Sequence, residues 1–238
     1  MKRISAIFIA GMMVLFSSCN NDGEKKDETK TADTTVAPTP VVATPAFTPF
    51  KVFVIKHKVK DFPKWKTGYL AHDSMRMAYG ISQYRLGRGI EDSTMVVVID
   101  KMNDVTKAKE FAAMPSLKDA MTKAGVVGMP TFDYIDVVWN DDSKIDQRDR
   151  VMVKHKVKDY DAWKKAYDAE GKATRTANGF TDRAIGRGVE DPNTVYLVFV
   201  INDMAKAKAR MNSPELKKIM TDAGVEGPPQ AFFYRLEE

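Results

Sequence analysis

Cysteine and histidine are scarce in this chain of 238 residues, which has one cysteine, Cys19, and three histidines, His57, His72 and His155. A lone cysteine excludes an intrachain disulfide bond and a Cys/His metal cluster. The three histidines are too few and too scattered to predict a metal site from their spacing. We therefore expect neither a metal nor a bound cofactor.

Runs of one charge and catalytic signatures are also missing. The net charge of +5 is small for this length, and no run of Lys and Arg is interleaved with aromatic residues. A surface of mixed charge is expected, and nucleic acid is not expected as a partner. The chain lacks a P-loop, a carboxylate pair, and Ser/His/Asp or Cys/His nucleophile patterns. Gly87-Arg88-Gly89 has no third glycine and opens no helix, so it is not a phosphate-binding fingerprint.

Long apolar runs are absent except at the amino terminus. There, a charged start at Lys2 and Arg3 precedes the uncharged, apolar segment 4–16. This segment is too short to span a bilayer as a helix but suits a signal peptide, which we place at residues 1–18. No later segment approaches the length of a transmembrane helix, so the remainder is expected to lie outside the membrane.

The residues before the only cysteine resemble the lipobox of bacterial lipoproteins. Ser17 and Ser18 precede Cys19, although Phe16 stands where that pattern prefers Leu, Val or Ile. The resemblance implies cleavage before Cys19, acyl chains such as palmitate on the new terminus, and a membrane partner. It also implies a lipid-anchored location in the bacterial cell envelope, on the periplasmic or the surface-exposed side of the outer membrane. A cleaved secretory signal followed by a stray cysteine is the alternative.

Residues 19–49 are rich in Pro and Thr, and such a composition predicts a disordered tether. About 190 residues remain, enough for two modest domains. We expect a first unit at 50–139, a polar linker at 140–148 and a second unit at 149–238.

An internal repeat divides the remainder of the chain. His57-Lys58-Val59-Lys60-Asp61 returns as His155-Lys156-Val157-Lys158-Asp159. A tryptophan, an arginine, Gly-Arg-Gly-x-Glu-Asp, Lys-Ala-Lys and Ala-Gly-Val-x-Gly-x-Pro follow both copies in the same order. A repeat of this size has to be recognised before the fold can be predicted.

Periodicity predicts the same elements in each copy. Alternating residues predict first strands, aspartates cap the helices that follow, and glycines end them. The expected strands are 53–59, 82–90, 95–99 and 131–138, then 151–157, 181–189, 195–200 and 230–236. The expected helices follow Asp61, Asp104, Asp159 and Asp203, and the second helix of each copy is broken at Pro115 or Pro214.

The order strand-helix-strand-strand-helix-strand is the split βαβ, ferredoxin-like arrangement. With their His-Lys-Val-Lys-Asp starts and Gly-Arg-Gly hairpins, residues 50–138 and 149–237 resemble the dimeric α/β-barrel superfamily, including antibiotic-biosynthesis-monooxygenase-like domains. The resemblance implies an α+β fold in which paired sheets enclose a cavity. Two copies in one chain would form that pair internally, as a pseudo-dimeric α/β barrel. The alternative is two separate units, each pairing with another chain.

His57 and His155 are the candidate catalytic residues. Each shares a strand face with apolar neighbours, and the sequence leaves open which face that is. On a face toward the cavity, a neutral imidazole could act as a general base or orient a ligand. On a face toward the helices, it would be a hydrogen-bonded core residue.

Three further pairs are candidates for ligand binding. The arginines late in the first helices and within the Gly-Arg-Gly hairpins could bind an anion, or could form ion pairs with the adjacent Glu-Asp that fix the hairpin. The tryptophans could roof a pocket or belong to the core. These residues are Arg76, Arg88, Trp65, Arg175, Arg187 and Trp163.

Three functions remain open. The first is a lipid-anchored envelope protein that binds a small apolar or aromatic ligand in the barrel. The second is a cofactor-independent monooxygenase or isomerase that uses the two histidines. The third is a structural, assembly-mediating envelope protein with a solid barrel. The superfamily also includes haem-degrading members, but their ordered Asn, Trp and His set is not found, so that activity is not inferred.

Overall fold

A computed structural model of the chain describes residues 47–237. The predicted signal peptide, the lipidation site Cys19 and residues 19–46 of the predicted tether lie outside this range. β1 begins at Phe50, directly after the predicted tether. Within the range described, no helix is long and apolar enough to cross a membrane.

Both halves of the described chain follow the predicted order of elements. The first half contains β1 (Phe50–Val59), α1 (Phe62–Ala71), α2 (Asp73–Ala78), β2 (Ile81–Gly89), β3 (Met95–Met102), α3 (Val105–Ala113), α4 (Pro115–Lys123) and β4 (Val126–Asn140). The second half contains β5 (Asp149–Val157), α5 (Tyr160–Ala177), β6 (Phe180–Gly188), β7 (Thr194–Ile201), α6 (Met204–Met211), α7 (Pro214–Asp222) and β8 (Val225–Leu236).

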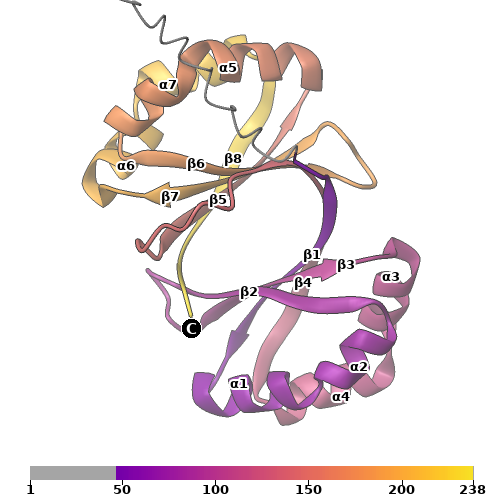
Figure 1. Ribbon diagram of the computed structural model, residues 1–238. Coiled ribbons are helices and arrows are strands. Elements are labelled where there is room, and N and C mark those ends of the chain that lie inside the picture. Colours follow the sequence, from indigo (N-terminus) through magenta and orange to yellow (C-terminus); the bar gives the residue numbers. More distant parts are fainter. Residues whose placement is uncertain (1–46, 238) are drawn as a thin grey trace, which may run out of the picture. The chain divides into compact units, whose positions relative to one another are not determined.

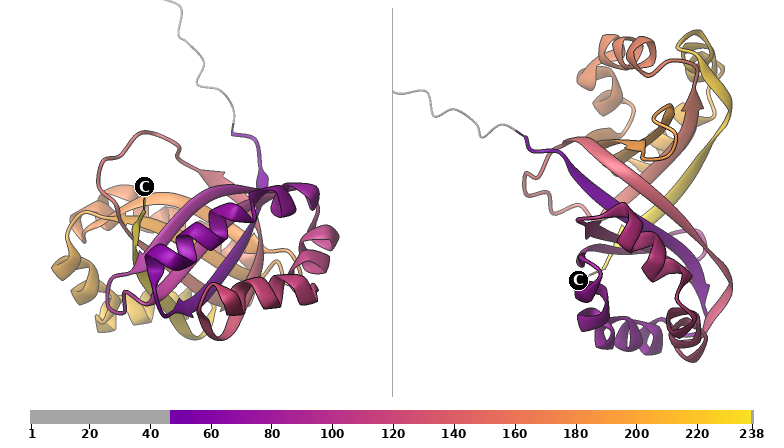
Figure 2. Two further views of the ribbon diagram at one scale, coloured as in Figure 1. Left: turned by 90° about the horizontal axis from the view of Figure 1, so that it is seen from below. Right: turned by 90° about the vertical axis from the view of Figure 1, so that its right-hand side faces the viewer.

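These strands close into one antiparallel barrel in the order β1-β3-β2-β8-β5-β7-β6-β4. The strands of each half are neighbours, and the halves join along two seams, where β2 pairs with β8 and β4 pairs with β6. The helices lie outside the barrel, with each half's helices against its own strands (Figure 1, Figure 2). The predicted α+β fold, an intrachain pseudo-dimeric barrel of two ferredoxin-like units, is therefore confirmed.

The alternation in β1 separates two cores. Phe53 and Ile55 pack beneath the helices of the first half, whereas Val52 and Val54 face the barrel interior and share a cluster with Met152 of the second half. Because successive side chains of a strand point to opposite faces, His57 lies on the helix side with Phe53 and Ile55.

The predicted helix starts are confirmed. The side chains of Asp61, Asp104, Asp159 and Asp203 each accept a hydrogen bond from the backbone N–H three residues later. The first helix of each half is less regular than predicted. In the first half it is divided at His72, and α5 contains a kink at Gly171, which has a φ of 79°.

The fourth strands start earlier than predicted, at Val126 and Val225 rather than near 131 and 230. Gly128 and Pro130 break the alternation in the first of them, so its beginning is not recognisable locally. Pairing with β1 continues through this stretch because the register shifts between Lys56 and Lys58.

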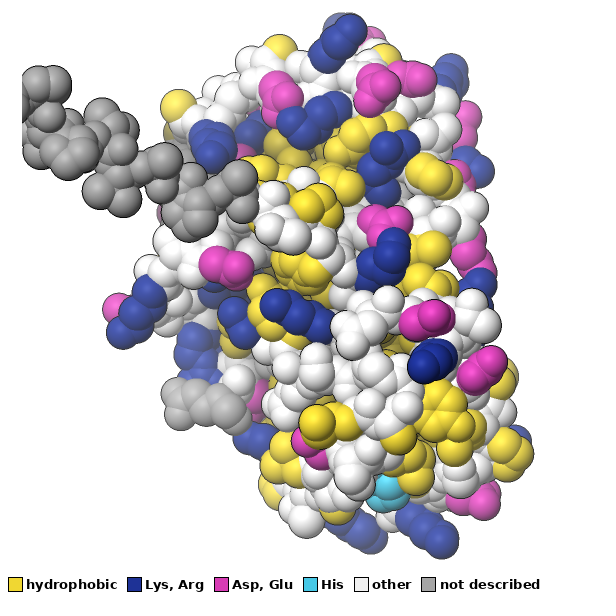
Figure 3. Space-filling view, turned by 45° about the vertical axis from the view of Figure 1, so that its right-hand side comes forward, with side chains coloured by type: hydrophobic (Ala, Val, Ile, Leu, Met, Phe, Trp, Pro, Cys, Tyr) yellow, Lys and Arg dark blue, Asp and Glu magenta, His cyan; other side chains and the backbone are white. Residues whose placement is uncertain are grey.

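The Gly-Arg-Gly motifs lie at the seams, where the two halves approach closely. A Cβ atom on Gly87 would lie 2.4 Å from Cδ2 of Tyr234, and one on Gly186 would lie 2.4 Å from Cγ2 of Ile135. The first glycine of each motif therefore leaves room for a side chain of the other half's last strand. The outer surface is of mixed charge, and on the face shown in Figure 3 basic and acidic side chains are interspersed with apolar ones.

Candidate functional site

His57 and His155 lie at equivalent positions on β1 and β5, and both face the helices. Their side chains are buried, with 4% and 6% of their surface exposed. Each imidazole packs against the tryptophan of the following helix, with ring centroids 5.2 Å apart for His57 and Trp65 and 5.5 Å apart for His155 and Trp163. Each half therefore brings its candidate histidine and its candidate tryptophan into contact, which was not predicted from the sequence.

Neither ring nitrogen of His57 or of His155 has a hydrogen-bond partner. This differs from the expectation that a helix-side histidine would be hydrogen-bonded. Burial lowers the pKa of both residues to about 4, because the surrounding core disfavours the imidazolium form. Both rings are therefore neutral at pH 7 and each keeps one donor and one acceptor uncommitted.

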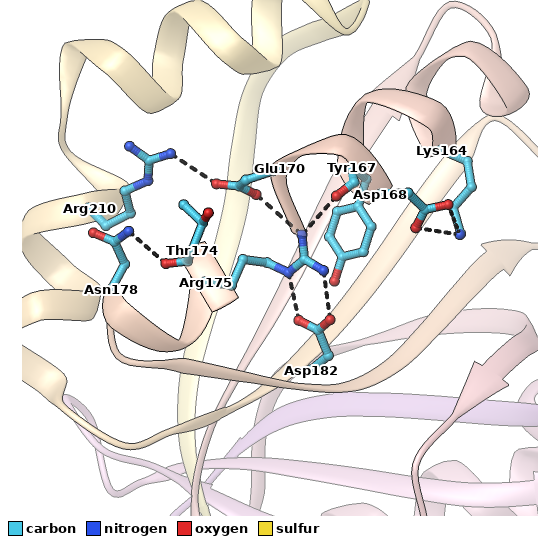
Figure 4. A network of polar contacts seen from close by, with 9 residues as sticks. All are labelled: Lys164, Tyr167, Asp168, Glu170, Thr174, Arg175, Asn178, Asp182 and Arg210. Carbon is cyan, nitrogen blue, oxygen red and sulfur yellow. Dashed lines mark hydrogen bonds and ion pairs between the residues drawn. The ribbon is translucent and has the colours of Figure 1, made fainter. Parts of the chain in front are cut away.

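Arg175 is the centre of a buried polar network in the second half (Figure 4). Its Nε and Nη2 each donate to the carboxylate of Asp182 at 2.7 Å, and its Nη1 donates to the backbone oxygen of Tyr167 at 2.8 Å. Glu170 lies 3.4 Å from Arg175 and also accepts a hydrogen bond from Arg210 at 2.9 Å. The donors of Arg175 are thus occupied by groups of the protein.

The first half holds a related network around Arg76. Nη1 of Arg76 donates to the backbone oxygen of Tyr69 at 2.6 Å, and the Tyr69 hydroxyl donates to Asp100 at 2.8 Å. Asp100 is fully buried, and burial raises the pKa of its carboxyl to about 6 although Tyr69 and Arg76 oppose the shift.

The carboxylate of this network comes from different strands in the two halves. Asp100 on β3 pairs across the sheet with Gln83 on β2, whereas Asp182 on β6 pairs with Phe199 on β7. These two cross-strand pairs are equivalent in the repeat. The acid lies on β3 in the first half, whereas in the second half it lies on β6, the equivalent of β2. Neither acid was predicted from the sequence. For Asp100, its position directly after the apolar run 95–99 was the available signal.

Arg88 and Arg187 fix their hairpins, but through backbone oxygens rather than the predicted Glu-Asp carboxylates. Nε and Nη2 of Arg88 donate to the carbonyl of Ser93 at 3.2 and 3.1 Å, and Nε of Arg187 donates to the carbonyl of Pro192 at 2.7 Å. Each guanidinium also covers an aromatic ring at the start of the first helix, at 4.4 and 3.8 Å. The structure does not bring them together with the histidines.

A cavity of about 540 Å³ lies between α5, α6, α7 and the sheet of the second half. His155, Trp163 and Arg175 line it, so three sequence-predicted residues meet there. Its other lining residues are mostly aromatic or aliphatic. They include Val153, Tyr167, Glu170, Phe180, Leu197, Phe199, Arg210, Met211, Leu216, Ile219, Met220, Ala231 and Phe233.

The corresponding cavity beside His57 measures only about 60 Å³. Phe111 is 2% exposed there, and the equivalent position on α6 is Arg210, which turns to Glu170 and Glu215. Phe132 on β4 packs against this core, and its equivalent on β8 is Ala231. The second half thus lacks two rings that fill the first.

One edge of the larger cavity is contributed by the other half. Glu91, in the hairpin between β2 and β3, accepts a hydrogen bond from Lys208 on α6 at 2.7 Å, and both residues line the cavity. Lys109 and Glu190 form the reciprocal ion pair between the halves. Within residues 47–237, no group of His, Cys, Asp and Glu could hold a metal ion.

No protein-family model matches this sequence, and no curated protein matches it. Solved structures match its fold. A proposed monooxygenase of Fusobacterium nucleatum subsp. nucleatum is 15% identical with a TM-score of 0.50, over 80% of this chain and 93% of that chain. An anthrone oxidase-like protein is 13% identical with a TM-score of 0.50, over 79% of this chain and 92% of that chain.

A proposed chlorite dismutase is 12% identical with a TM-score of 0.51, over 80% of this chain and 96% of that chain. At such identities the likeness shows the fold alone, as expected from the resemblance to the dimeric α/β barrels. The site therefore has to be interpreted from its own geometry.

Proposed function

We propose that this protein binds a small, neutral, largely apolar ligand with an aromatic ring in the helix-side cavity of its second half. A volume of about 540 Å³ and a mainly apolar lining are typical of a small-molecule site. The observation that carries the proposal is His155, a buried imidazole at the wall of this cavity with both ring nitrogens unpartnered. A ligand hydroxyl or carbonyl would satisfy one of them once a turn of the imidazole brings that nitrogen to the cavity surface, since neither nitrogen is accessible in this structure.

The charges around the cavity favour a neutral ligand. Arg175 is paired with Asp182, and Arg210 is paired with Glu170 and Glu215. An anion would have to compete with these carboxylates, whereas a neutral ring can pack on Trp163 and its aromatic neighbours without disturbing any ion pair.

Native mass spectrometry of the protein purified from its own envelope, followed by fluorescence titration with the released compound, tests this proposal. His155→Phe is expected to weaken binding by about fivefold to 150-fold, since loss of a buried hydrogen bond is worth about 1–3 kcal/mol. His57→Phe is the matched control and is expected to leave affinity within about twofold.

A second pair of variants tests the location. Ala231→Phe restores the ring found at the equivalent position of the first half and is expected to abolish binding by filling the cavity. Phe132→Ala removes that ring from the first half and is expected to leave binding in the second half unchanged. Equal loss of binding in His57→Phe and His155→Phe, or full binding in Ala231→Phe, would contradict the proposal.

A cofactor-independent monooxygenase or isomerase is the second candidate, because His155 presents a neutral imidazole to the cavity. Binding is favoured over catalysis since no carboxylate is bonded to the imidazole, and accepting a proton at pH 7 with a pKa near 4 costs about 4 kcal/mol. Turnover of an identified substrate by a folded His57→Ala/His155→Ala variant would rule this candidate out. The larger cavity lies between the sheet and the helices rather than inside the barrel, where the ligand was predicted from the sequence, and it gives the protein room for a ligand even where the barrel interior is filled.

We also propose that the protein is anchored in the bacterial envelope through lipidated Cys19, on the basis of the lipobox-like residues before it. Two or more acyl chains hold a protein stably at a membrane where one does not. In cell fractionation, Cys19→Ala is expected to move the protein from the membrane to the soluble fraction, whereas Cys19→Ala protein that stays in the membrane fraction would contradict lipid anchoring.

A further inference from the structure

A second group of arginines lies at one end of the barrel, away from the helix-side cavity. Arg150 on β5 is 4% exposed, and its Nη1 donates to the backbone oxygens of Gln147 and Asp149 at 2.5 and 3.0 Å. The equivalent residue in the first half is Val52, which lines the barrel interior. An arginine has therefore replaced an apolar residue at a buried position.

Two more arginines line the same internal cavity, which measures about 90 Å³. Arg85 donates to the backbone oxygen of Tyr84 at 2.8 Å, and Arg183 donates to that of Ser143 at 2.7 Å. In the described chain, only Arg183 among the three has a carboxylate in ion-pair range, Asp141 at 3.9 Å. This contrasts with the arginines of the helix-side cavity, which are paired with carboxylates.

Asn140 adds one more side-chain donor at this end. The side-chain nitrogen of Asn140 is buried without a partner and lines the cavity. The nearby acids are engaged elsewhere, since Asp149 accepts two bonds from Arg235 and Asp142 accepts from the Tyr84 hydroxyl.

The cations also act on one another. The pKa of Arg150 is lowered by burial, and the charges of Arg183 and Arg85 lower it further while Tyr234 and Asp149 oppose the shift. A bound anion would relieve this repulsion and would accept the open N–H groups, which are arranged in a fork suited to carboxylates.

Below the arginines the cavity is apolar. Its walls include Val52, Val54, Ile99, Val137, Met152 and Val198. A volume of about 90 Å³ corresponds to roughly three water molecules, which limits an occupant to a handful of heavy atoms. Charge at one end and an apolar wall at the other favour a short alkyl chain that ends in an acid group over a fully hydrophilic anion.

We propose that this end of the barrel binds a short-chain aliphatic monocarboxylate. The carboxylate accepts from Arg85, Arg150 and Asn140, and the alkyl chain lies against the valines of the barrel interior. The site is separate from the helix-side cavity and requires both halves, because Arg85 belongs to β2 and Arg150 to β5.

Isothermal titration of the purified full chain at low ionic strength tests the ligand class. Acetate, propionate, butyrate, octanoate, 1-butanol and inorganic phosphate are the probes. Affinity is expected to rise from acetate to butyrate, and butyrate is expected to bind at least about tenfold more tightly than 1-butanol, phosphate or octanoate.

Variants test the residues. Arg150→Gln and Arg85→Gln are each expected to weaken butyrate binding by about tenfold or more, while Arg187→Gln, an arginine on a hairpin, changes it less than about twofold. Because Arg85 is exposed at the rim, Arg85→Gln is expected to fold and can test the site even if Arg150→Gln does not fold. Ala231→Phe is expected to bind butyrate normally, which separates this site from the proposed aromatic-ligand cavity.

Three results would overturn the proposal. Phosphate binding as tightly as butyrate would show an unselective cation cluster. 1-Butanol binding as tightly as butyrate would show an apolar pocket that does not use the arginines. Unchanged butyrate affinity in Arg85→Gln and in folded Arg150→Gln would show that this end of the barrel is not a carboxylate site. Absence of carboxylate binding at millimolar concentration would show the same.

Discussion

His57 and His155 are identical residues at equivalent positions, and both are buried with neither ring nitrogen partnered. An imidazole buried without a partner loses its bonds to water and gains none in return, at a cost of about 1–3 kcal/mol per unsatisfied group. In the first half the ring lies beside a small cavity and adds to the core, whereas in the second half the same ring borders a cavity that can hold a ligand. The same residue therefore has room for a ligand beside it in the second half but not in the first, because the adjacent cavities differ in volume.

Burial of the two histidines makes folding stability depend on pH. Their folded-state pKa of about 4 lies below the ordinary value of 6.5, so the unfolded chain binds protons first as the pH falls from 6.5 to 4. Each histidine therefore removes roughly 3 kcal/mol of stability across that window, about 7 kcal/mol for the two, and has little effect at pH 7 and above. Urea unfolding between pH 7.5 and 4.5 is expected to show a smaller loss in His57→Met/His155→Met than in the wild type.

Asp100 acts in the opposite direction and provides the control. Its folded-state pKa of about 6 is above the ordinary value of 3.8, so its protonation stabilises the folded state as the pH falls from 6 to 4. Asp100→Asn is expected to steepen the acid loss. Identical pH profiles for the wild type and the histidine double variant would show that the two rings are hydrated or bonded in solution.

At the scale of elements, the seams decide whether the halves fit together. Each seam brings a Gly-Arg-Gly strand against the last strand of the other half, and Gly87 and Gly186 lie where a methyl group would overlap Tyr234 or Ile135. Both neighbours are buried, so neither can move aside easily.

Replacing either seam glycine by alanine is therefore expected to destabilise the fold. Gly87→Ala and Gly186→Ala should each lower the free energy of unfolding by about 1–3 kcal/mol through overpacking, measured by chemical denaturation. Gly68→Ala is the milder comparison, because its Cβ would lie 3.3 Å from Cβ of Ala124 rather than 2.4 Å from a neighbour, and the equivalent residue of α5 is Ala166. A neutral Gly87→Ala would show that the seam is more open than the structure describes.

The buried networks around Arg76 and Arg175 also depend on how neighbouring strands pair. Arg76 and Arg175 lie at equivalent helix positions, yet their acids come from neighbouring strands. Asp100 and Asp182 can exchange sides because directly paired residues of adjacent strands reach the same space. The network is therefore a property of the strand pair rather than of one strand.

At the scale of the whole molecule, the two halves complete each other. The interior cluster joins Val52 and Val54 of one half with Met152, Tyr196 and Tyr234 of the other, so an isolated half would expose this apolar face. The ion pairs of Glu91 with Lys208 and of Lys109 with Glu190 are exposed, and such pairs add at most about 1 kcal/mol each.

Residues 45–144 produced alone are therefore expected to self-associate or aggregate, and co-expression with residues 145–238 should give a one-to-one complex. Size-exclusion chromatography with light scattering distinguishes these states. A soluble, monomeric half with a dispersed NMR spectrum would contradict the role assigned to the interior cluster.

The elements and their order were predictable from the sequence, because they depend on local information. Alternation in β1, the capping aspartates and the terminating glycines each act over a few residues, and the repeat allows every inference to be checked twice. The early start of β4 was missed because Gly128 and Pro130 conceal the alternation.

By itself, the sequence determined two equivalent ferredoxin-like units, each with a histidine in its first strand and a tryptophan in the helix that follows. Only the tertiary structure decided which face of the sheet those histidines occupy, and that only the second is beside a large cavity. The volume of that cavity depends on side chains far apart in the chain, Arg210 on α6 and Ala231 on β8, where the first half has Phe111 and Phe132. The volume of a cavity depends on which side chains pack against one another in the folded protein, and periodicity along the chain does not predict that packing.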